Sequence, residues 1–207
     1  MTGDAYYPDG YLVFKRTNLS ATFFFGNHCT DGAVHRFAAR YRFARELQNP
    51  TFHAYTASVA AAYGALCKFL FAFGALETFV RVLGTNMNLD DLVPRLQRYP
   101  TRTWDARLRE YASHRALFRY IARHSRRGVR ACCLSFISRR PYNFLILAQA
   151  VRNSFGHGHL TASGQSVDPD DMRGIASTLR STLLTFMNDE LSKVIDDALE
   201  DLSTPPD

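Results

Sequence analysis

Lysine is scarce in this chain of 207 residues, whose 25 cationic side chains comprise 22 arginines and only Lys15, Lys68 and Lys193. A genome-wide codon bias would explain this ratio. So would a partner with planar or phosphate acceptors, because a guanidinium meets these with two parallel donors that an ammonium lacks. The formal net charge of +6 is too mild to indicate nucleic-acid binding by itself.

Cysteine is also sparse, and the four thiols do not follow the spacing of a disulfide framework. Cys67 lies in an apolar run, and neither Cys29 nor the adjacent pair Cys132 and Cys133 has a zinc-ligand spacing to histidine. We therefore expect no metal, no cofactor and a reducing cytoplasm as the compartment. The polar N-terminus gives no sign of a signal peptide.

The sequence contains no glycine-rich phosphate loop, no Gly-x-Ser-x-Gly elbow and no internal repeat. With 46% hydrophobic and 21% charged residues, it is not a disordered, collagen-like or coiled-coil chain. One apolar stretch, residues 54–76, raises the question of a membrane span, but it contains Lys68. We expect a buried core helix there and no membrane contact, with a membrane-associated bundle as the alternative.

Acidic residues are rare in the middle of the chain. Residues 98–140 hold 12 arginines against Asp105 and Glu110, whereas residues 168–207 hold three cations and ten anions. This asymmetry indicates either binding to a polyanion or association between oppositely charged patches.

Apolar positions recur with helical spacing from Thr51 nearly to the end, which predicts an all-α helical bundle over residues 51–203. The predicted helices span 52–83, 88–98, 103–127, 142–155 and 168–202. Because helix 142–155 is apolar on nearly all sides, we expect it at the centre. The last helix has a strong start, with Asp168 as the cap and Pro169 in the first turn.

Residues 1–50 are predicted to form an N-terminal arm. Turn-forming residues surround two short apolar and aromatic runs, Tyr11 to Phe14 and Ala21 to Phe25, which indicates a β-hairpin or an irregular arm over residues 1–32. A short helix over 33–48, closed by Pro50, follows.

Residues 151–159, Val-Arg-Asn-Ser-Phe-Gly-His-Gly-His, are the most unusual segment. Arg152 is the only charged side chain between positions 141 and 167, and it lies at the end of the most apolar helix. Such an arginine costs free energy unless it meets an anion or a carboxylate. We expect His157 to face the same space, so that one group fixes a phosphate while the other moves a proton near neutral pH.

This segment resembles the hallmark of the HEPN family (higher eukaryotes and prokaryotes nucleotide-binding domains), which is an arginine, a polar residue and, a few positions later, a histidine. The matching residues are Arg152, Asn153 and His157, followed by Gly158. The same Arg/His spacing occurs twice within helix 103–127, but there no asparagine follows the arginine.

The resemblance implies a metal-independent endoribonuclease of toxin or defence type that acts as a homodimer, with the two motifs facing each other. In such an enzyme a ribose 2′-hydroxyl attacks its own phosphodiester, and an antitoxin protein is an implied partner. His157 would serve as base or acid, Arg152 would stabilise the phosphorane, and Asn153 would orient either the histidine or the phosphate. His159 and Glu77 are supporting candidates, Glu77 as the group that neutralises or orients Arg152.

The arginine-rich stretch 98–130 would then be the RNA-contacting face, with aromatic side chains interleaved. The expected RNA contacts are Arg119, Arg123, Arg126 and Arg127, and the interleaved aromatics are Trp104, Tyr111, Phe118 and Tyr120. The alternative is a solvated helix face that balances the acidic last helix. For the whole protein, the alternative is a non-catalytic module that binds a nucleotide or a partner and dimerises.

Overall fold

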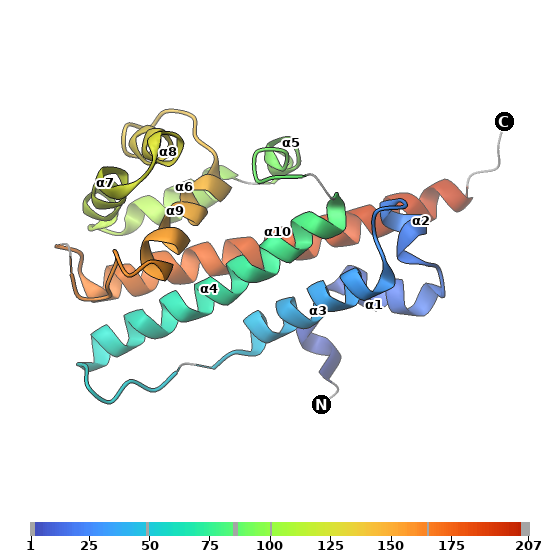
Figure 1. The fold of residues 1–207 in the computed structure, drawn as a ribbon, viewed down its shortest axis with the longest axis horizontal. Coiled ribbons are helices and arrows are strands. Elements are labelled where there is room, and N and C mark those ends of the chain that lie inside the picture. Colours follow the sequence, from blue (N-terminus) through green and yellow to red (C-terminus); the bar gives the residue numbers. More distant parts are fainter. Residues whose placement is uncertain (1–2, 49, 85–86, 100, 165, 204–207) are drawn as a thin grey trace.

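The computed structural model describes residues 3–48, 50–84, 87–99, 101–164 and 166–203, and over these residues the fold is all-α, as predicted (Figure 1). The described part contains ten α-helices, one 3-10 helix and no β-strand. The elements are η1 (Gly3–Tyr6), α1 (Asp9–Thr17), α2 (Ala21–Phe25), α3 (Asp31–Glu46), α4 (Ala57–Leu83), α5 (Val93–Leu96), α6 (Thr101–Glu110), α7 (His114–His124), α8 (Arg127–Ile137), α9 (Phe144–Gly156) and α10 (Pro169–Ser203).

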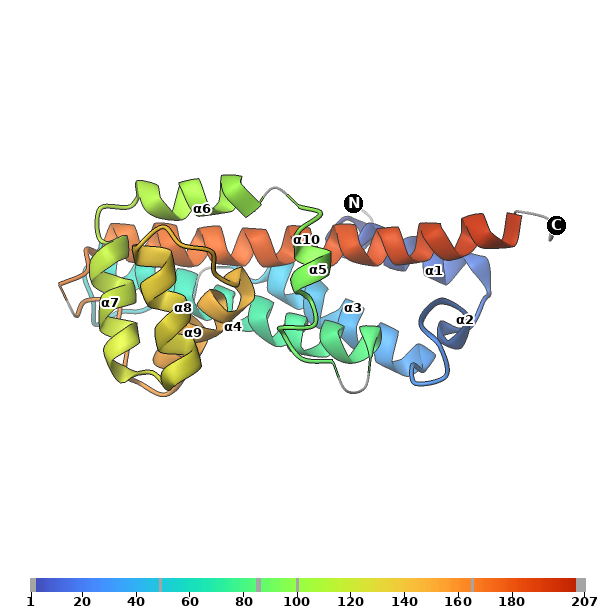
Figure 2. The ribbon, with the colours of Figure 1, turned by 90° about the horizontal axis from the view of Figure 1, so that it is seen from above.

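The two longest helices, α4 and α10, pack against each other and form the centre of the molecule. α10 runs along its whole length, α4 packs against it, and α3 packs on α4, while α6 to α9 gather over the N-terminal half of α10 (Figures 1 and 2). α4 has apolar side chains at spacings of three and four, and Phe69, Phe73, Leu76 and Phe79 are at most 1% exposed. Each such side chain contributes roughly 2 kcal/mol relative to an exposed position.

By length and composition alone, α4 is also the one helix in the described part of the chain that could cross a membrane. Its 27 residues include a segment of mean hydropathy 1.7, half of which is buried within the structure. Core helices of soluble proteins pass the same test, and α4 is covered by α3, α9 and α10. The absence of membrane contact stays a prediction.

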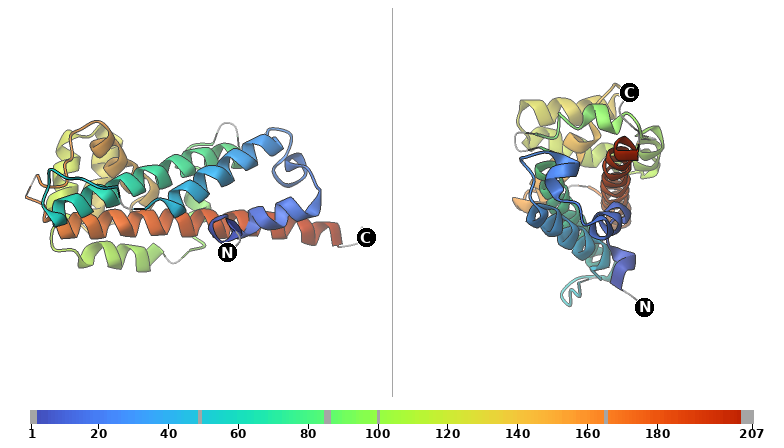
Figure 3. Two further views of the ribbon diagram at one scale, coloured as in Figure 1. Left: turned by 90° about the horizontal axis from the view of Figure 1, so that it is seen from below. Right: turned by 90° about the vertical axis from the view of Figure 1, so that its right-hand side faces the viewer.

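The prediction of a β-hairpin or irregular arm is wrong for residues 3–32, which form η1, α1, α2 and the first turn of α3. Tyr11 and Phe14, three positions apart on α1, belong to the same buried cluster as α4 and α10. α1 lies along the C-terminal half of α10 (Figure 3), so this segment helps to build the core. Helices of nine and five residues are too short to display a clear helical period, which explains the error.

The closest approach of α1 to α10 is at Gly10. Its N–H donates to Ser192 Oγ at 3.1 Å, and a Cβ on Gly10 would lie 2.8 Å from the Ser192 backbone. One residue earlier, the Asp9 N–H donates to Asn188 Oδ1 at 2.9 Å, and Asn188 Nδ2 donates to the Asp9 carboxylate at 3.0 Å. The missing side chain at position 10 therefore lets two backbones come into contact.

Four of the later predictions match the structure to within a few residues, since helices 33–48, 52–83, 142–155 and 168–202 correspond to α3, α4, α9 and α10. The predicted start of the last helix is also confirmed. Asp168 Oδ1 accepts hydrogen bonds from the N–H groups of Asp170 and Asp171, at 2.8 and 3.3 Å.

The single helix predicted over 103–127 is wrong, because the structure divides it into α6 and α7 and adds α8 after it. The break lies at residues 111–113. The Ser113 N–H donates to Asp171 Oδ2 at 2.7 Å, and Ser113 Oγ accepts from the Asp168 N–H at 3.1 Å. The start of α10 therefore holds this turn. The helix predicted over 88–98 is reduced to the single turn of α5.

One carboxylate is completely buried within the bundle. Glu190 of α10 is 0% exposed, forms an ion pair with Arg95 of α5 and accepts a hydrogen bond from Tyr99 Oη at 2.9 Å. Burial, followed by the Glu190 charge, raises the pKa of Tyr99 above its usual range, so the phenol stays a donor. A buried charge is tolerated only when it is paired, and this pairing ties the connection between α4 and α6 to α10.

We expect Gly10→Ala to lower the free energy of unfolding by about 1–3 kcal/mol, because the added methyl group meets the α10 backbone. Gly74→Ala is the matched control, since Gly74 lies within α4 and a Cβ there meets nothing within 4 Å. That variant should be neutral or more stable by up to about 1 kcal/mol. Urea titration followed by circular dichroism measures both. Equal shifts in the two variants would contradict the close contact of α1 with α10.

Glu190→Gln should lower the free energy of unfolding by about 2–3 kcal/mol, because Arg95 loses the charge that compensates it. For a chain of this size, the loss corresponds to roughly 5–10 °C in Tm. Asp196→Asn, at an exposed position on the same helix, is the control and should change Tm by less than about 2 °C. A Glu190→Gln variant that melts with the wild type would show that the pair does not hold α5 in place.

Candidate functional site

α9 places the predicted motif at the edge of the core. Asn143 caps the helix, with its Oδ1 accepting from the Leu145 N–H at 2.9 Å, and the turns that follow are buried against α4, α7 and α8. The helix ends where Gly158 adopts a left-handed conformation, φ 75°, and its N–H donates to the Phe155 carbonyl at 3.0 Å. This glycine cap turns the chain out of the helix directly after His157.

Arg152 meets a carboxylate, as the sequence led us to expect, although its side chain is 36% exposed. Its guanidinium lies 3.2 Å from Glu77 Oε1 of α4 and donates to Asn153 Oδ1 at 2.9 Å. The guanidinium carbon is also 5.9 Å from the centre of the Phe73 ring. Three neighbours therefore orient this arginine, and two of them, Asn153 and Glu77, are predicted site residues.

His157 is exposed, and its backbone N–H closes the last turn of α9 on the Asn153 carbonyl at 3.0 Å. Among the described hydrogen bonds, none joins its ring to Arg152. Five residues along an α-helix rotate a side chain by about 140° from the first, so the two groups leave the helix in different directions. The expectation that they share one space within a single chain is therefore not met by direct contact.

His159 lies on the α7 side of the motif. Its ring is nearly parallel to that of His124, with an interplanar angle of 12° and centroids 6.3 Å apart, and its carbonyl accepts from Tyr120 Oη at 2.6 Å. The His124 ring is in turn 4.6 Å from that of Tyr120. His124 belongs to one of the two other Arg/His spacings within predicted helix 103–127, with Arg119. Only the packing of α7 on α9 brings it to the motif.

The four predicted RNA-binding arginines gather around the connection between α7 and α8. Arg119 and Arg123 lie one turn apart on α7, Arg126 caps α8 and Arg127 begins it. All four are exposed, and none forms an ion pair within the described part of the chain. We call this set the arginine corner. It adjoins the motif because Arg123 immediately precedes His124.

The interleaved aromatic residues do not form a stacking surface. Trp104 and Phe118 are only 6% and 0% exposed, because they pack into the core. Tyr111 is half-buried against Gly174 and Thr178 of α10, to which its hydroxyl is hydrogen-bonded at 3.1 Å. The prediction that these rings contact RNA is wrong, since they stabilise the bundle. Tyr120 is half-buried, and its hydroxyl holds the loop that carries His159.

A different aromatic cluster lies beside the end of α9. Phe155 packs on Tyr63 of α4 at 6.2 Å, and Tyr63 packs on Phe52 and Tyr55 at 5.7 and 5.0 Å. Tyr55 is 49% exposed. Three of its members lie within residues 52–63 and the fourth is distant in the chain, so only the packing of α9 on α4 reveals the cluster.

The described residues include no group of three or more His, Cys, Asp or Glu side chains that could hold a metal ion. The four cysteines are free. Burial raises the pKa of the Cys29 and Cys132 thiols to about 11, so both remain protonated and poorly nucleophilic near neutral pH. The side chains around the end of α9 include the imidazole of His157, the guanidinium of Arg152 and the carboxylate of Glu77.

Comparison with protein-family models, with curated proteins and with solved structures found no match to this chain. The resemblance of Arg152, Asn153 and His157 to the HEPN motif therefore stays a prediction.

Replacing Tyr120 by phenylalanine should loosen the loop after α9, because the hydroxyl holds the His159 carbonyl. We expect a loss of about 1 kcal/mol in the free energy of unfolding and faster amide exchange at Leu160, whose N–H donates to the Ser154 carbonyl at 2.9 Å. Tyr55→Phe, at an exposed position, is the matched control and should change neither. Unaltered exchange at Leu160 in Tyr120→Phe would show that the loop is held by other contacts.

Proposed function

We propose that this chain is a metal-independent endoribonuclease of toxin or defence type, which cleaves RNA at a site completed by a second copy of the chain. The observation that carries the proposal is the set of groups placed around the end of α9. An oriented arginine, an exposed motif histidine and the His124–His159 pair adjoin an arginine corner with no ion pairs among the described residues. These groups suit phosphodiester chemistry and require no metal.

The reaction is transfer of the phosphoryl group within the RNA strand. The ribose 2′-oxygen forms a bond to phosphorus while the bond from phosphorus to the 5′-oxygen breaks, which leaves a 2′,3′-cyclic phosphate and a 5′-hydroxyl. One imidazole takes the 2′-hydroxyl proton and another supplies a proton to the departing 5′-oxygen. We assign one of these roles to His157 and the other to the same residue of a second copy.

Arg152 is assigned to the negative charge that develops on the phosphorane. Glu77 and Asn153 hold the guanidinium in one orientation before substrate arrives, which reduces the cost of ordering it in the transition state. His159, stacked on His124, is a supporting group that keeps the loop in position beside the motif.

The arginine corner provides the approach surface for RNA. Its four guanidinium groups have no intramolecular carboxylate to displace within the described structure, so phosphates of the strand can pair with them directly. The exposed Tyr55, in the cluster with Tyr63 and Phe155, offers a ring on which an unpaired base can stack.

The second candidate is a non-catalytic module that binds a nucleotide or a partner and dimerises. The ion pair between Arg152 and Glu77 favours this module, because an arginine whose charge is already balanced by a carboxylate needs no ligand. In both cases we propose a homodimer in the cytoplasm, without membrane contact and without a cofactor. For the ribonuclease, the expected protein partner is an antitoxin that covers the arginine corner.

The two candidates are separated by cleavage of labelled RNA in buffer containing EDTA. We expect His157→Ala and Arg152→Ala each to lower the rate by a factor of about 100 or more, because each removes a group that acts in the transition state. His28→Ala is the control. His28 is exposed in the connection between α2 and α3, and its ring is hydrogen-bonded to the Val82 carbonyl at 3.1 Å. Helices α2 and α3 meet at the opposite end of the molecule from α7 and α9 (Figure 1), so the rate should be unchanged.

The melting temperature of each variant shows whether the fold is intact. If the wild type does not cleave RNA, or if both motif variants cleave it at the wild-type rate, the ribonuclease proposal is wrong. Expression in cells gives an independent measurement, in which growth arrest by the wild type should be relieved by His157→Ala but not by His28→Ala.

A further inference from the structure

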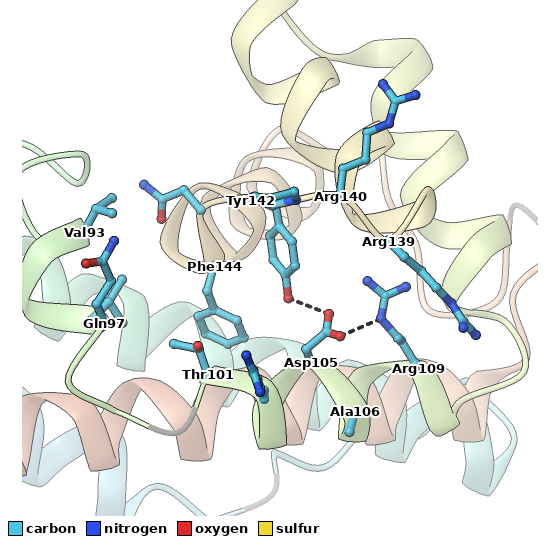
Figure 4. Close-up of a pocket in the computed structure, with 14 residues that line it drawn as sticks. Val93, Gln97, Thr101, Asp105, Ala106, Arg109, Arg139, Arg140, Tyr142 and Phe144 are labelled. Atoms are coloured by element: carbon cyan, nitrogen blue, oxygen red, sulfur yellow. Dashed lines mark hydrogen bonds and ion pairs between the residues drawn. The ribbon is translucent and has the colours of Figure 1, made fainter.

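A second site lies at the other end of α9. A pocket of about 840 Å³ opens between α5, α6 and the connection from α8 to α9 (Figure 4). It meets α9 at Phe144, whereas Arg152 lies eight residues further on, about 12 Å along the helix axis. Its volume is in the range of cavities that hold small organic ligands.

The pocket is strongly cationic. Arg102, Arg109, Arg139 and Arg140 line it together with a single acid, Asp105, which leaves a net charge of +3. Asp105 is already occupied, since its carboxylate accepts from Arg109 Nε at 2.7 Å and from Tyr142 Oη at 2.9 Å. The other three arginines form no ion pair within the described part of the chain.

Two of the groups around Asp105 are held rigidly. Arg109 lies over the Phe136 ring, with its guanidinium carbon 4.3 Å from the ring centre, and its side chain is 15% exposed. Burial, followed by the Asp105 charge, raises the pKa of Tyr142 above its usual range, so its hydroxyl stays a donor to Asp105. Arg109 is therefore held in position, whereas Arg102, Arg139 and Arg140 are exposed.

The backbone at Arg139 is an independent indication of a ligand. α8 ends in a Schellman motif, in which the Arg140 N–H donates to the Ser135 carbonyl at 2.9 Å and the Arg139 N–H to the Phe136 carbonyl at 3.2 Å. Arg139 occupies the left-handed position of this motif, φ 58°, which favours glycine. An arginine at this position has a backbone cost that glycine would avoid, which is consistent with a role for its side chain at the pocket.

The lining is also asymmetric. Three of the four arginines, Arg109, Arg139 and Arg140, lie at one end, while Val93, Gln97 and Phe144 lie at the other (Figure 4). The fourth, Arg102, follows Thr101 and belongs to the second end. A fitting ligand has several adjacent negative charges at one end and a larger, uncharged and hydrogen-bonding body at the other. Guanidinium groups pair best with phosphate oxygens, which they meet with two donors.

We propose that this pocket binds a free nucleoside diphosphate or triphosphate, with the phosphates on Arg109, Arg139 and Arg140 and the nucleoside toward Gln97 and Phe144. The charge of such a ligand matches the excess cation of the lining. The site is separate from the motif at Arg152 and His157 and does not depend on the ribonuclease proposal.

Isothermal titration in EDTA, with ATP and GTP and with their diphosphates and monophosphates, tests the proposal. We expect affinity to fall in the order triphosphate, diphosphate, monophosphate, to weaken with added salt and to be absent for adenosine. At 100 times Kd, the triphosphate should raise Tm by about 5 °C or more. If no nucleotide binds at 1 mM, or if the monophosphate binds as tightly as the triphosphate, the proposal is wrong.

Arg139→Gly separates binding from folding, because glycine suits the backbone conformation while the guanidinium is lost with the rest of the side chain. We expect triphosphate affinity to fall at least tenfold while Tm without ligand stays the same or rises. Arg140→Gln should weaken binding similarly. Arg81→Gln removes an exposed arginine of α4 and should leave affinity unchanged. Unchanged affinity in Arg139→Gly and Arg140→Gln, or an equal loss in Arg81→Gln, would overturn the assignment.

The same phosphate chemistry occurs at the 5′ end of a triphosphorylated RNA. A short RNA with a 5′-triphosphate is therefore titrated beside GTP, together with the same RNA bearing a 5′-hydroxyl. Tighter binding of free GTP supports the proposal. Binding of the triphosphorylated RNA more than tenfold tighter than GTP, and lost in Arg139→Gly, would overturn the free nucleotide as the ligand.

Discussion

The need to cover α4 governs most of this structure. An apolar helix of 27 residues with phenylalanines on more than one side cannot be left in water, so it has to be surrounded by other helices. α10 lies along one side, α3 along another, and α9 packs across it. Because α9 packs on α4, Arg152 reaches Glu77, and because α7 also packs on α9, His124 reaches His159.

The long elements could be predicted from the sequence because their periodic patterns extend over several turns. α4, α9 and α10 are of this kind, and the Asp168 cap was visible as a local motif. The short helices α1 and α2 could not, since their burial depends on α10, which is more than 140 residues away. The break between α6 and α7 was hidden for the same reason, because Asp171 of α10 holds Ser113.

Most of the candidate site that was predicted is local in sequence. Arg152, Asn153 and His157 stand close together in the chain, and the exception, Glu77, was named because it is the only acid in the predicted helix 52–83. The partners that come from elsewhere, His124, Tyr120 and the cluster around Tyr63, depend on helix packing that no spacing reveals. The pocket between α5, α6 and the connection from α8 to α9 was missed for a further reason. Its four arginines were counted as part of one basic stretch, whereas the fold separates them from the arginine corner.

The pairing of α1 with the far half of α10 has a consequence for the order of events during synthesis. Asp9 and Asn188 are 179 residues apart, so α1 lacks its main partner on a ribosome that has not yet produced α10. Until then, the sides of α1 and α4 that α10 covers remain in contact with water, although α3 can already pack on α4 and α7 on α8. The nascent chain is most prone to aggregation during this interval.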